Sequence, residues 1–232
     1  MSLKKVTICL CASRPHIDRQ AVIEIANALK TAGYEIQIEP DLCATAIDSQ
    51  QEMEAISTST VIACYPRAIN ALFERFGLKA SQTLNLRTSC SSEILKHFNI
   101  ESASASQVLE TGENQVKSAI DAWYPVLDSE RCIQCGKCHD FCLFGVYTLD
   151  NGEVRVTNPT NCKTDCPACA RTCPVKAVIF PKYPKSPING GLDDEESASS
   201  NINPNATYGD LLRNRLKERR LTGLSLLKPT KE

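Results

Sequence analysis

The most informative stretches of this sequence are CIQCGKCHDFC at residues 132–142 and CKTDCPACARTCP at residues 162–174. The first has the cysteine spacing CxxCxxCxxxC, and the second repeats it with one extra residue in its first gap. Three closely spaced cysteines let one loop wrap three corners of an iron-sulfur cubane, while the fourth cysteine reaches the neighbouring cubane. The two motifs therefore predict a pair of 4Fe-4S clusters that exchange one ligand each.

Each motif is expected to complete the cluster of the other. Two sets of ligands follow, one for the first cluster, Cys132, Cys135, Cys138 and Cys173, and one for the second, Cys142, Cys162, Cys166 and Cys169. Thiolate ligation needs no catalytic residue, and none is assigned. CxxC pairs also build four-cysteine zinc sites, but two interleaved sets with this spacing fit iron-sulfur clusters better. His139 is expected to tune the nearby cluster rather than to bind it.

The segment between the motifs predicts a β-hairpin. Two β-prone runs, 146–149 and 153–157, flank Asp150-Asn151-Gly152. Asn-Gly between such runs is the strongest short signal for a tight hairpin turn. We expect this hairpin to cover the clusters on one side.

Residues 128–182 resemble the bacterial two-cluster ferredoxins, both in the two cysteine repeats and in the closing Cys173-Pro174. The resemblance implies a ferredoxin-like fold and one-electron transfer. The sequence departs from that pattern at Leu143, where proline is usual, and in the widened gap between Cys162 and Cys166. The extra residue either bulges out harmlessly or loosens Cys162 as a ligand.

The first half of the chain has an alternating pattern. Short β-prone runs at 5–12, 34–39, 59–64 and 82–87 are separated by segments with helical spacing, such as 18–32 and 67–76. This alternation is typical of an α/β fold with a parallel sheet. In the first helix an apolar stripe indicates core packing, and Gly33 is a suitable C-cap.

We predict three regions along the chain: an amino-terminal α/β domain at 1–125, a small α+β ferredoxin-like domain at 126–183, and a tail at 184–232. A helix over 105–124 closes the first domain before Pro125. The tail begins with a polar, glycine-containing segment that predicts a flexible linker at 186–205. It ends in an amphipathic, basic helix, which is either an ordinary solvated helix or a docking element for a partner protein.

Five more cysteines lie near the ends of the predicted strands: Cys9, Cys11, Cys43, Cys64 and Cys90. The carboxyl ends of strands converge in a doubly wound sheet, so these side chains could meet in one pocket. Three interpretations stay open: a third iron-sulfur cluster, redox-active thiols, and thiols that pack as small buried hydrophobes. Arg67 and Arg87 could offset the charge of such a cluster or lie on the surface.

These cysteines and their neighbours resemble the amino-terminal domain of the flavin-binding component of heterodisulfide reductase, over about residues 5–95. The similar stretches are CLC at 9–11, VIACYPR at 61–67 and NLR at 85–87. The resemblance implies a module that carries or contacts an additional cluster in flavin-linked electron-transfer complexes. No GxGxxG follows any predicted strand, so the chain lacks the flavin-binding domain of that family.

Composition narrows the classes of partner and compartment. Lys+Arg 26 against Asp+Glu 27 leaves a net charge of -1, which gives no electrostatic reason to expect nucleic acid or an anionic membrane. An odd total of 13 cysteines argues against a disulfide scaffold. No stretch approaches the roughly 18 apolar residues of a membrane-spanning helix. We expect a protein of the reducing cytoplasm.

The sequence thus predicts an iron-sulfur electron-transfer protein, acting as a non-catalytic subunit of a larger oxidoreductase complex. The expected partners are a flavoprotein, a hydrogenase or another oxidoreductase subunit. Two alternatives stay open: an iron-sulfur redox sensor or adaptor, and a thiol-disulfide reductase that uses Cys9 and Cys11. Replacing these two cysteines separates the cases, because loss of iron indicates a cluster and loss of turnover alone indicates thiol chemistry.

Overall fold

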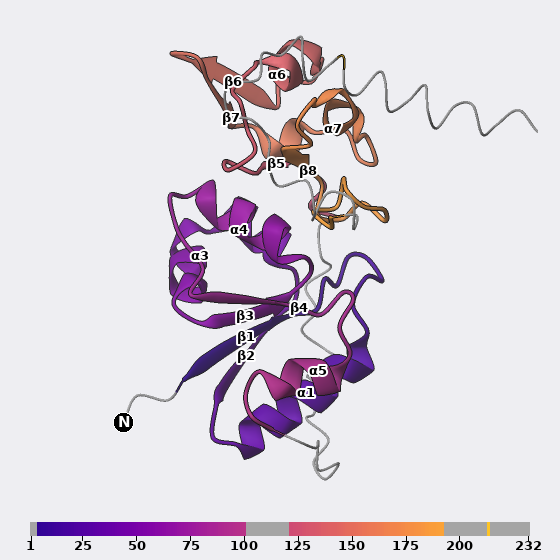
Figure 1. Ribbon diagram of the computed structural model, residues 1–232. Helices are drawn as coiled ribbons and strands as arrows, with labels where there is room; N and C mark the ends of the chain where they lie inside the picture. Colours follow the sequence, from indigo (N-terminus) through magenta and orange to yellow (C-terminus); the bar gives the residue numbers. More distant parts are fainter. Residues whose placement is uncertain (1–3, 101–120, 193–212, 214–232) are drawn as a thin grey trace, which may run out of the picture.

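A four-stranded parallel sheet forms the centre of the amino-terminal lobe (Figure 1). The computed structural model describes residues 4–100, 121–192 and Arg213. The strands lie in the order β2-β1-β3-β4, with bounds β1 (Lys5–Cys9), β2 (Glu35–Glu39), β3 (Thr60–Ala63) and β4 (Gln82–Asn85). They coincide with the four predicted runs, so the parallel α/β architecture is confirmed.

Helices cover both faces of this sheet (Figure 1). One face is covered by α1 (Arg19–Thr31) and α5 (Ser91–Lys96), and the other by α2 (Leu42–Asp48), α3 (Gln50–Ser57) and α4 (Pro66–Glu74). The Asp18 side chain caps α1 by accepting a hydrogen bond from the N–H of Gln20. Gly33 follows the helix with a φ of +85°, as its predicted role requires.

Alternation along the strands sends side chains to two separate cores. Val6 and Ile8 pack with α1 and α5, whereas Cys9 packs with α2, α3 and α4. The same alternation places Ile62 on the first side and Val61 on the second. Cys9 therefore lies on the face of the sheet that is turned toward the rest of the chain.

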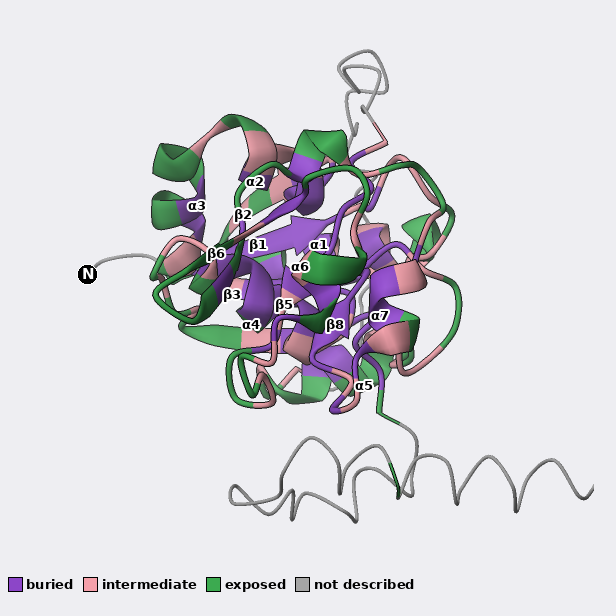
Figure 2. Cartoon of the chain, turned by 90° about the horizontal axis from the view of Figure 1, so that it is seen from above, coloured by how far each residue is buried: buried purple, intermediate pink, exposed green. Residues whose placement is uncertain are grey.

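The carboxy-terminal lobe consists of two small antiparallel sheets and two short helices. Strand β5 (Val126–Leu127) pairs with β8 (Val178–Ile179), and β6 (Tyr147–Asp150) pairs with β7 (Glu153–Val156). The helices are α6 (Lys137–Phe141) and α7 (Ala168–Thr172), and one 3-10 turn, η1, spans Pro159–Asn161. Figure 2 looks down on this lobe and shows α6 at the exposed surface.

The predicted hairpin is confirmed by the pairing of β6 with β7. Its two turn residues, Asn151 and Gly152, have φ values of +50° and +83°. Both central residues of a type I′ turn require positive φ, which explains why Asn-Gly occurs here.

The two lobes share part of their core. Ala122, Tyr124, Val126 and Ile179 pack in the same apolar cluster as the residues of α4. A buried ion pair also joins the lobes, because Lys182 Nζ lies 2.8 Å from Asp41 Oδ2 and the two side chains are 2% and 3% exposed. Arg67 pairs with Asp128 across the same boundary.

Two expectations around the second lobe need correction. The predicted helix over 105–124 falls largely outside the described residues, and its last part, 121–124, is extended because Trp123 and Tyr124 are buried against both lobes. The predicted linker over 186–205 begins with ordered turns at 186–192, where Asn189 is 1% exposed. The rest of that linker lies outside the described residues.

The predicted terminal helix also lies outside the described part of the chain, apart from Arg213, which is helical and exposed. Among the described residues, no helix has the length and apolar character needed to cross a membrane.

Candidate metal centres

Four cysteines of the carboxy-terminal lobe line one cavity: Cys132, Cys135, Cys138 and Cys173. We call them the first ligand set. They are the four residues that the sequence predicts for the first cluster. Apolar side chains complete the wall, including Val154 of the hairpin and Val175 and Val178 near β8. The N–H of Ala177 donates a hydrogen bond to Cys173 Sγ at 3.2 Å.

The electrostatics of these thiols reflect burial and mutual proximity. Burial raises the pKa of Cys138 to about 12, and charge on Cys173 and then Cys132 raises it further. Burial also raises the pKa of Cys132, against hydrogen bonding to its sulfur and with added effects of Cys173 and Cys135. A soft metal centre would therefore displace protons as it binds, since only the thiolate is a ligand.

A second group of neighbouring thiols consists of Cys142, Cys162, Cys166 and Cys169, which we call the second ligand set. Burial raises the pKa of Cys162 to about 12, followed in order by the effects of Cys169, Cys166 and Cys142. These are the other three predicted ligands of the second cluster. Burial raises the pKa of Cys169 to about 11.

A tyrosine from the hairpin contacts the second ligand set directly. The Tyr147 hydroxyl donates to Cys169 Sγ at 3.1 Å in a buried position. Burial, with Cys169 beside it, raises the pKa of Tyr147 well above the ordinary value, so the phenol keeps its proton and remains a donor. Hydrogen bonds to cluster sulfurs are one of the means by which proteins set reduction potentials.

The two ligand sets are adjacent, because Cys169 is one of the charges that raise the pKa of Cys138. His139 lies beside Asp140, with Nδ1 at 3.1 Å from Oδ1. Leu143, where proline is usual, is 93% exposed directly after Cys142. Within the described residues, no three His, Cys, Asp or Glu side chains meet as a single metal ion would require.

The extra residue of the second motif makes a contact between the lobes. Asp165, in the widened gap between Cys162 and Cys166, has a φ of +59°, a left-handed conformation that aspartate tolerates better than most residues. Its Oδ1 lies 2.9 Å from the guanidinium of Arg14. The widened gap therefore reaches the amino-terminal lobe.

The amino-terminal lobe brings together four of its five cysteines: Cys9, Cys11, Cys43 and Cys64. We call them the amino-terminal cysteine group, and all four are buried. Cys9 ends β1 and Cys64 follows β3, the two strands between which the chain order reverses. Such a switch point is the usual place for a ligand in an open parallel sheet.

Mutual charge effects connect these four thiols. Burial raises the pKa of Cys64 to about 12, and charge on Cys11 raises it further. Burial raises the pKa of Cys11 to about 11, with Asp41 as the next cause. The pKa values of Cys9 and Cys43 are raised well above the ordinary value, again mainly by burial. The N–H groups of Cys11 and Leu42 each donate to Cys9 Sγ at 3.4 Å.

Two cations from opposite lobes face this group. Charge on Lys182 and Arg87 lowers the pKa of Cys11. Burial alone would lower the pKa of Lys182, but charge on Cys43 and Asp41 outweighs burial and the pKa is raised. Arg87 donates to the carbonyls of Pro181 and Tyr183, on either side of Lys182. Sequence patterns did not indicate Lys182, because it lies in the other lobe.

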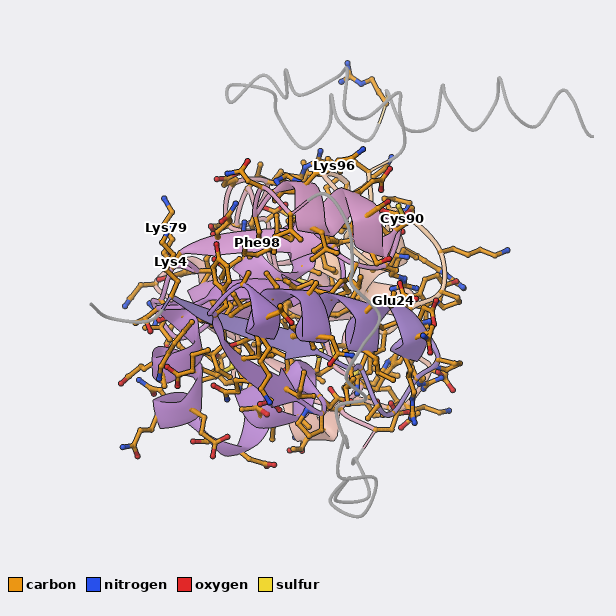
Figure 3. All side chains as sticks on the ribbon, turned by 90° about the horizontal axis from the view of Figure 1, so that it is seen from below. Lys4, Glu24, Lys79, Cys90, Lys96 and Phe98 are labelled. Atoms are coloured by element: carbon orange, nitrogen blue, oxygen red, sulfur yellow. The ribbon has the colours of Figure 1, made fainter. Side chains whose placement is uncertain are left out.

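Cys90 does not join the amino-terminal cysteine group. It is exposed at the start of α5 and contacts Ser92 Oγ at 3.0 Å. Figure 3 shows it on the lower face of the lobe, near Glu24 of α1. Its hydrogen bond with Ser92 is the main cause of a lowered pKa. The expected group of five is therefore a group of four.

Comparison with known proteins identifies the carboxy-terminal lobe. The family of 4Fe-4S dicluster domains matches residues 124–199. An uncharacterized ferredoxin of Methanocaldococcus jannaschii is 46% identical over 61 residues, which cover 26% of this chain and 42% of that protein. The chain thus spans less than half the length of this relative.

Two further relatives from the same organism are matched over most of their length. The pyruvate synthase subunit PorD is 35% identical over 78 residues, or 32% of this chain and 87% of PorD. A second uncharacterized ferredoxin is 37% identical over 58 residues, or 24% of this chain and 74% of the relative. Through this segment the chain belongs to the 4Fe-4S dicluster family, and it contains an iron-sulfur domain of the ferredoxin type.

Proposed function

We propose that this protein is an electron-transfer subunit of a larger oxidoreductase complex of the cytoplasm, with two 4Fe-4S clusters in its carboxy-terminal lobe. The first ligand set would hold one cluster and the second ligand set the other. The observation that carries this proposal is the cavity that all four cysteines of the first ligand set line together. Its apolar wall and thiol donors suit an iron-sulfur cluster.

Each cluster would supply a one-electron redox centre, and the protein residues define its environment. Thiolates of the two ligand sets would hold the iron, and the apolar side chains around the first set would exclude water. Ala177 N–H and the Tyr147 hydroxyl would donate to ligand sulfurs at 3.2 and 3.1 Å. Such donors favour the more negative, reduced state of a cluster.

Membership of a complex is supported by similarity and by the surface. PorD, by its name, is a subunit of pyruvate synthase. The carboxy-terminal lobe also exposes several large apolar side chains near its cysteine motifs: Ile133, Phe141, Leu143, Phe144 and Leu149. Exposed apolar side chains that gather on one lobe are typical of protein interfaces. The partner would be a flavoprotein, a hydrogenase or another oxidoreductase subunit.

For the amino-terminal cysteine group we propose a third iron-sulfur cluster. Four buried thiols at the switch point supply a full ligand set, and Lys182 and Arg87 would offset the charge of the bound centre. Thiol-disulfide chemistry is less well supported, because thiols with raised pKa values are poor nucleophiles. Cys9 and Cys11, the pair considered for that chemistry, both have raised pKa values.

Single-cysteine variants test these assignments. We expect Cys135→Ala and Cys166→Ala each to lose about four irons per chain, since a cubane holds four. Cys64→Ala should also lose about four. Cys90→Ala is the matched control and should keep the full iron content. An unchanged iron content in Cys135→Ala or Cys166→Ala would overturn the corresponding cluster of the carboxy-terminal lobe.

A further inference from the structure

The two ligand sets differ in what they face on the amino-terminal lobe. Cys162, of the second ligand set, packs against the apolar cluster that contains Cys9, Cys43 and Cys64. Cys132, of the first ligand set, instead borders a cavity of about 600 Å³ beside Glu74 and the residues after it. The second ligand set is thus the one that touches the surroundings of the amino-terminal cysteine group.

Helix α4 separates these two contacts. It begins at Pro66, two residues after Cys64, and ends at Glu74. Nine helical residues at about 1.5 Å each span roughly 13 Å. Because the helix starts at the carboxyl edge of the sheet and runs away from it, its far end, where Cys132 lies, is the end remote from Cys64.

The inserted residue of the second motif fastens this arrangement. Asp165 pairs with Arg14, which follows Cys11 by three residues, at 2.9 Å. Arg14 is itself fixed by Asp121 at 2.6 Å and by its position over the Trp123 ring, 5.4 Å from the centroid. The loop of the second ligand set is therefore linked to the loop that carries Cys11.

We propose that electrons pass between the lobes through the second ligand set, and that Asp165 holds this set against the amino-terminal cysteine group. This inference rests on the proposed function, in which both sites hold iron-sulfur clusters. One electron leaves the centre held by Cys142, Cys162, Cys166 and Cys169, and the same electron arrives at the centre held by the amino-terminal cysteine group. No proton and no ligand is transferred. The first ligand set communicates with the amino-terminal lobe only by way of the second.

Magnetic coupling in the fully reduced protein tests this order, because dipolar coupling between two spins falls steeply with their separation. Low-temperature EPR would be recorded on the dithionite-reduced wild type, on Cys166→Ala and on Cys135→Ala, each with its iron content measured. We expect the splitting of the amino-terminal signal to be lost in Cys166→Ala and kept in Cys135→Ala. If Cys166→Ala does not fold, Cys142→Ala removes a ligand of the same set.

The reverse pattern, or a splitting that survives in both variants with twelve irons in the wild type, would overturn the relay order and leave the three clusters standing. A wild type with about eight irons would instead refute the third cluster and the relay together. Deletion of Asp165 tests the latch: we expect a smaller splitting at unchanged iron content. Glu153→Gln, which removes the exposed pair with Arg155 in the same lobe, should leave the splitting unchanged, and an unchanged splitting after deletion of Asp165 would refute the latch.

Discussion

At the scale of single residues, burial gives identical thiol groups different reactivity. All thirteen cysteines are free in the structure, and they range from buried to exposed. Cys90 combines exposure with a lowered pKa, whereas burial raises the pKa values of Cys9 and Cys43 well above the ordinary value. Position in the fold, rather than residue type, therefore determines which thiols react and which are held for ligation.

This difference predicts the order of alkylation. A lowered pKa increases the thiolate fraction at neutral pH, so iodoacetamide should modify Cys90 before any other cysteine of the amino-terminal lobe. Mass spectrometry after brief anaerobic treatment measures the order. Modification of Cys9 or Cys43 at the same rate as Cys90 would contradict the burial described here.

Tyr147 offers a second residue-scale prediction. Tyr147→Phe removes the hydroxyl that donates to Cys169 Sγ, so the reduced state of the second cluster loses a stabilising hydrogen bond. A hydrogen bond of about 1 kcal/mol corresponds to roughly 40 mV for a one-electron couple. We expect the potential of that cluster to fall by about this amount in an EPR-monitored titration.

Tyr183→Phe is the control for this shift, because the Tyr183 hydroxyl contacts Arg171 rather than a sulfur. An equal shift in both variants would show that the effect of Tyr147 does not depend on its hydrogen bond.

At the scale of elements, local patterns predicted much of the fold. The four β-prone runs, helix α1 and the Asn-Gly hairpin have signals contained within a few residues, and each is present. Helices α2, α3 and α5 were not predicted, because 7, 8 and 6 residues are too few for a clear helical period. Residues 121–124 had a helical pattern, but contacts with both lobes hold them extended.

The candidate site divides in the same way. The spacing of the cysteine motifs is local, and the four predicted ligands of the first cluster do line one cavity. The partners that surround the amino-terminal cysteine group are distant in sequence: Lys182 and Asp41 are 141 residues apart, and Arg14 and Asp165 are 151 apart. No periodicity or spacing within one segment can indicate such pairs.

The turn segment after β8 carries an element-scale prediction. Gly190 has a φ of +95°, and a Cβ at this position would lie 2.8 Å from the Cβ of Ala68 in α4. Gly190→Ala should therefore lower the free energy of unfolding by about 1 to 3 kcal/mol, through a strained backbone and a clash.

Gly33→Ala is the matched control, because Gly33 also has a positive φ but a Cβ there meets nothing within 4 Å. Thermal unfolding of both variants should show the larger loss for Gly190→Ala. A smaller loss for Gly190→Ala would mean that the segment does not pack on α4.

At the scale of the whole molecule, the lobes are joined by charge as well as by apolar packing. Lys182 and Asp41 form a buried pair at 2.8 Å, and the Lys182 ammonium also donates to Ser13 Oγ. Lys182→Met leaves the Asp41 carboxylate buried without its partner, which typically costs about 3 kcal/mol or more. We expect a clear fall in the thermal unfolding temperature.

Lys5→Met is the comparison for this variant, because Lys5 pairs with Glu35 on the surface, where both side chains are more than half exposed. Surface pairs contribute little to stability, so its unfolding temperature should change little. Equal stability of Lys182→Met and the wild type would contradict a charge-linked boundary between the lobes.

The most direct test of the account as a whole is the quantification of iron and acid-labile sulfide in the anaerobically purified chain, with EPR before and after dithionite. Three cubanes of four irons each predict about twelve irons and twelve sulfides per chain, with signals that appear on reduction. About eight would confine the clusters to the carboxy-terminal lobe. Fewer than eight irons, or zinc with no EPR signal, would contradict the assignment of this protein as a two-cluster electron carrier.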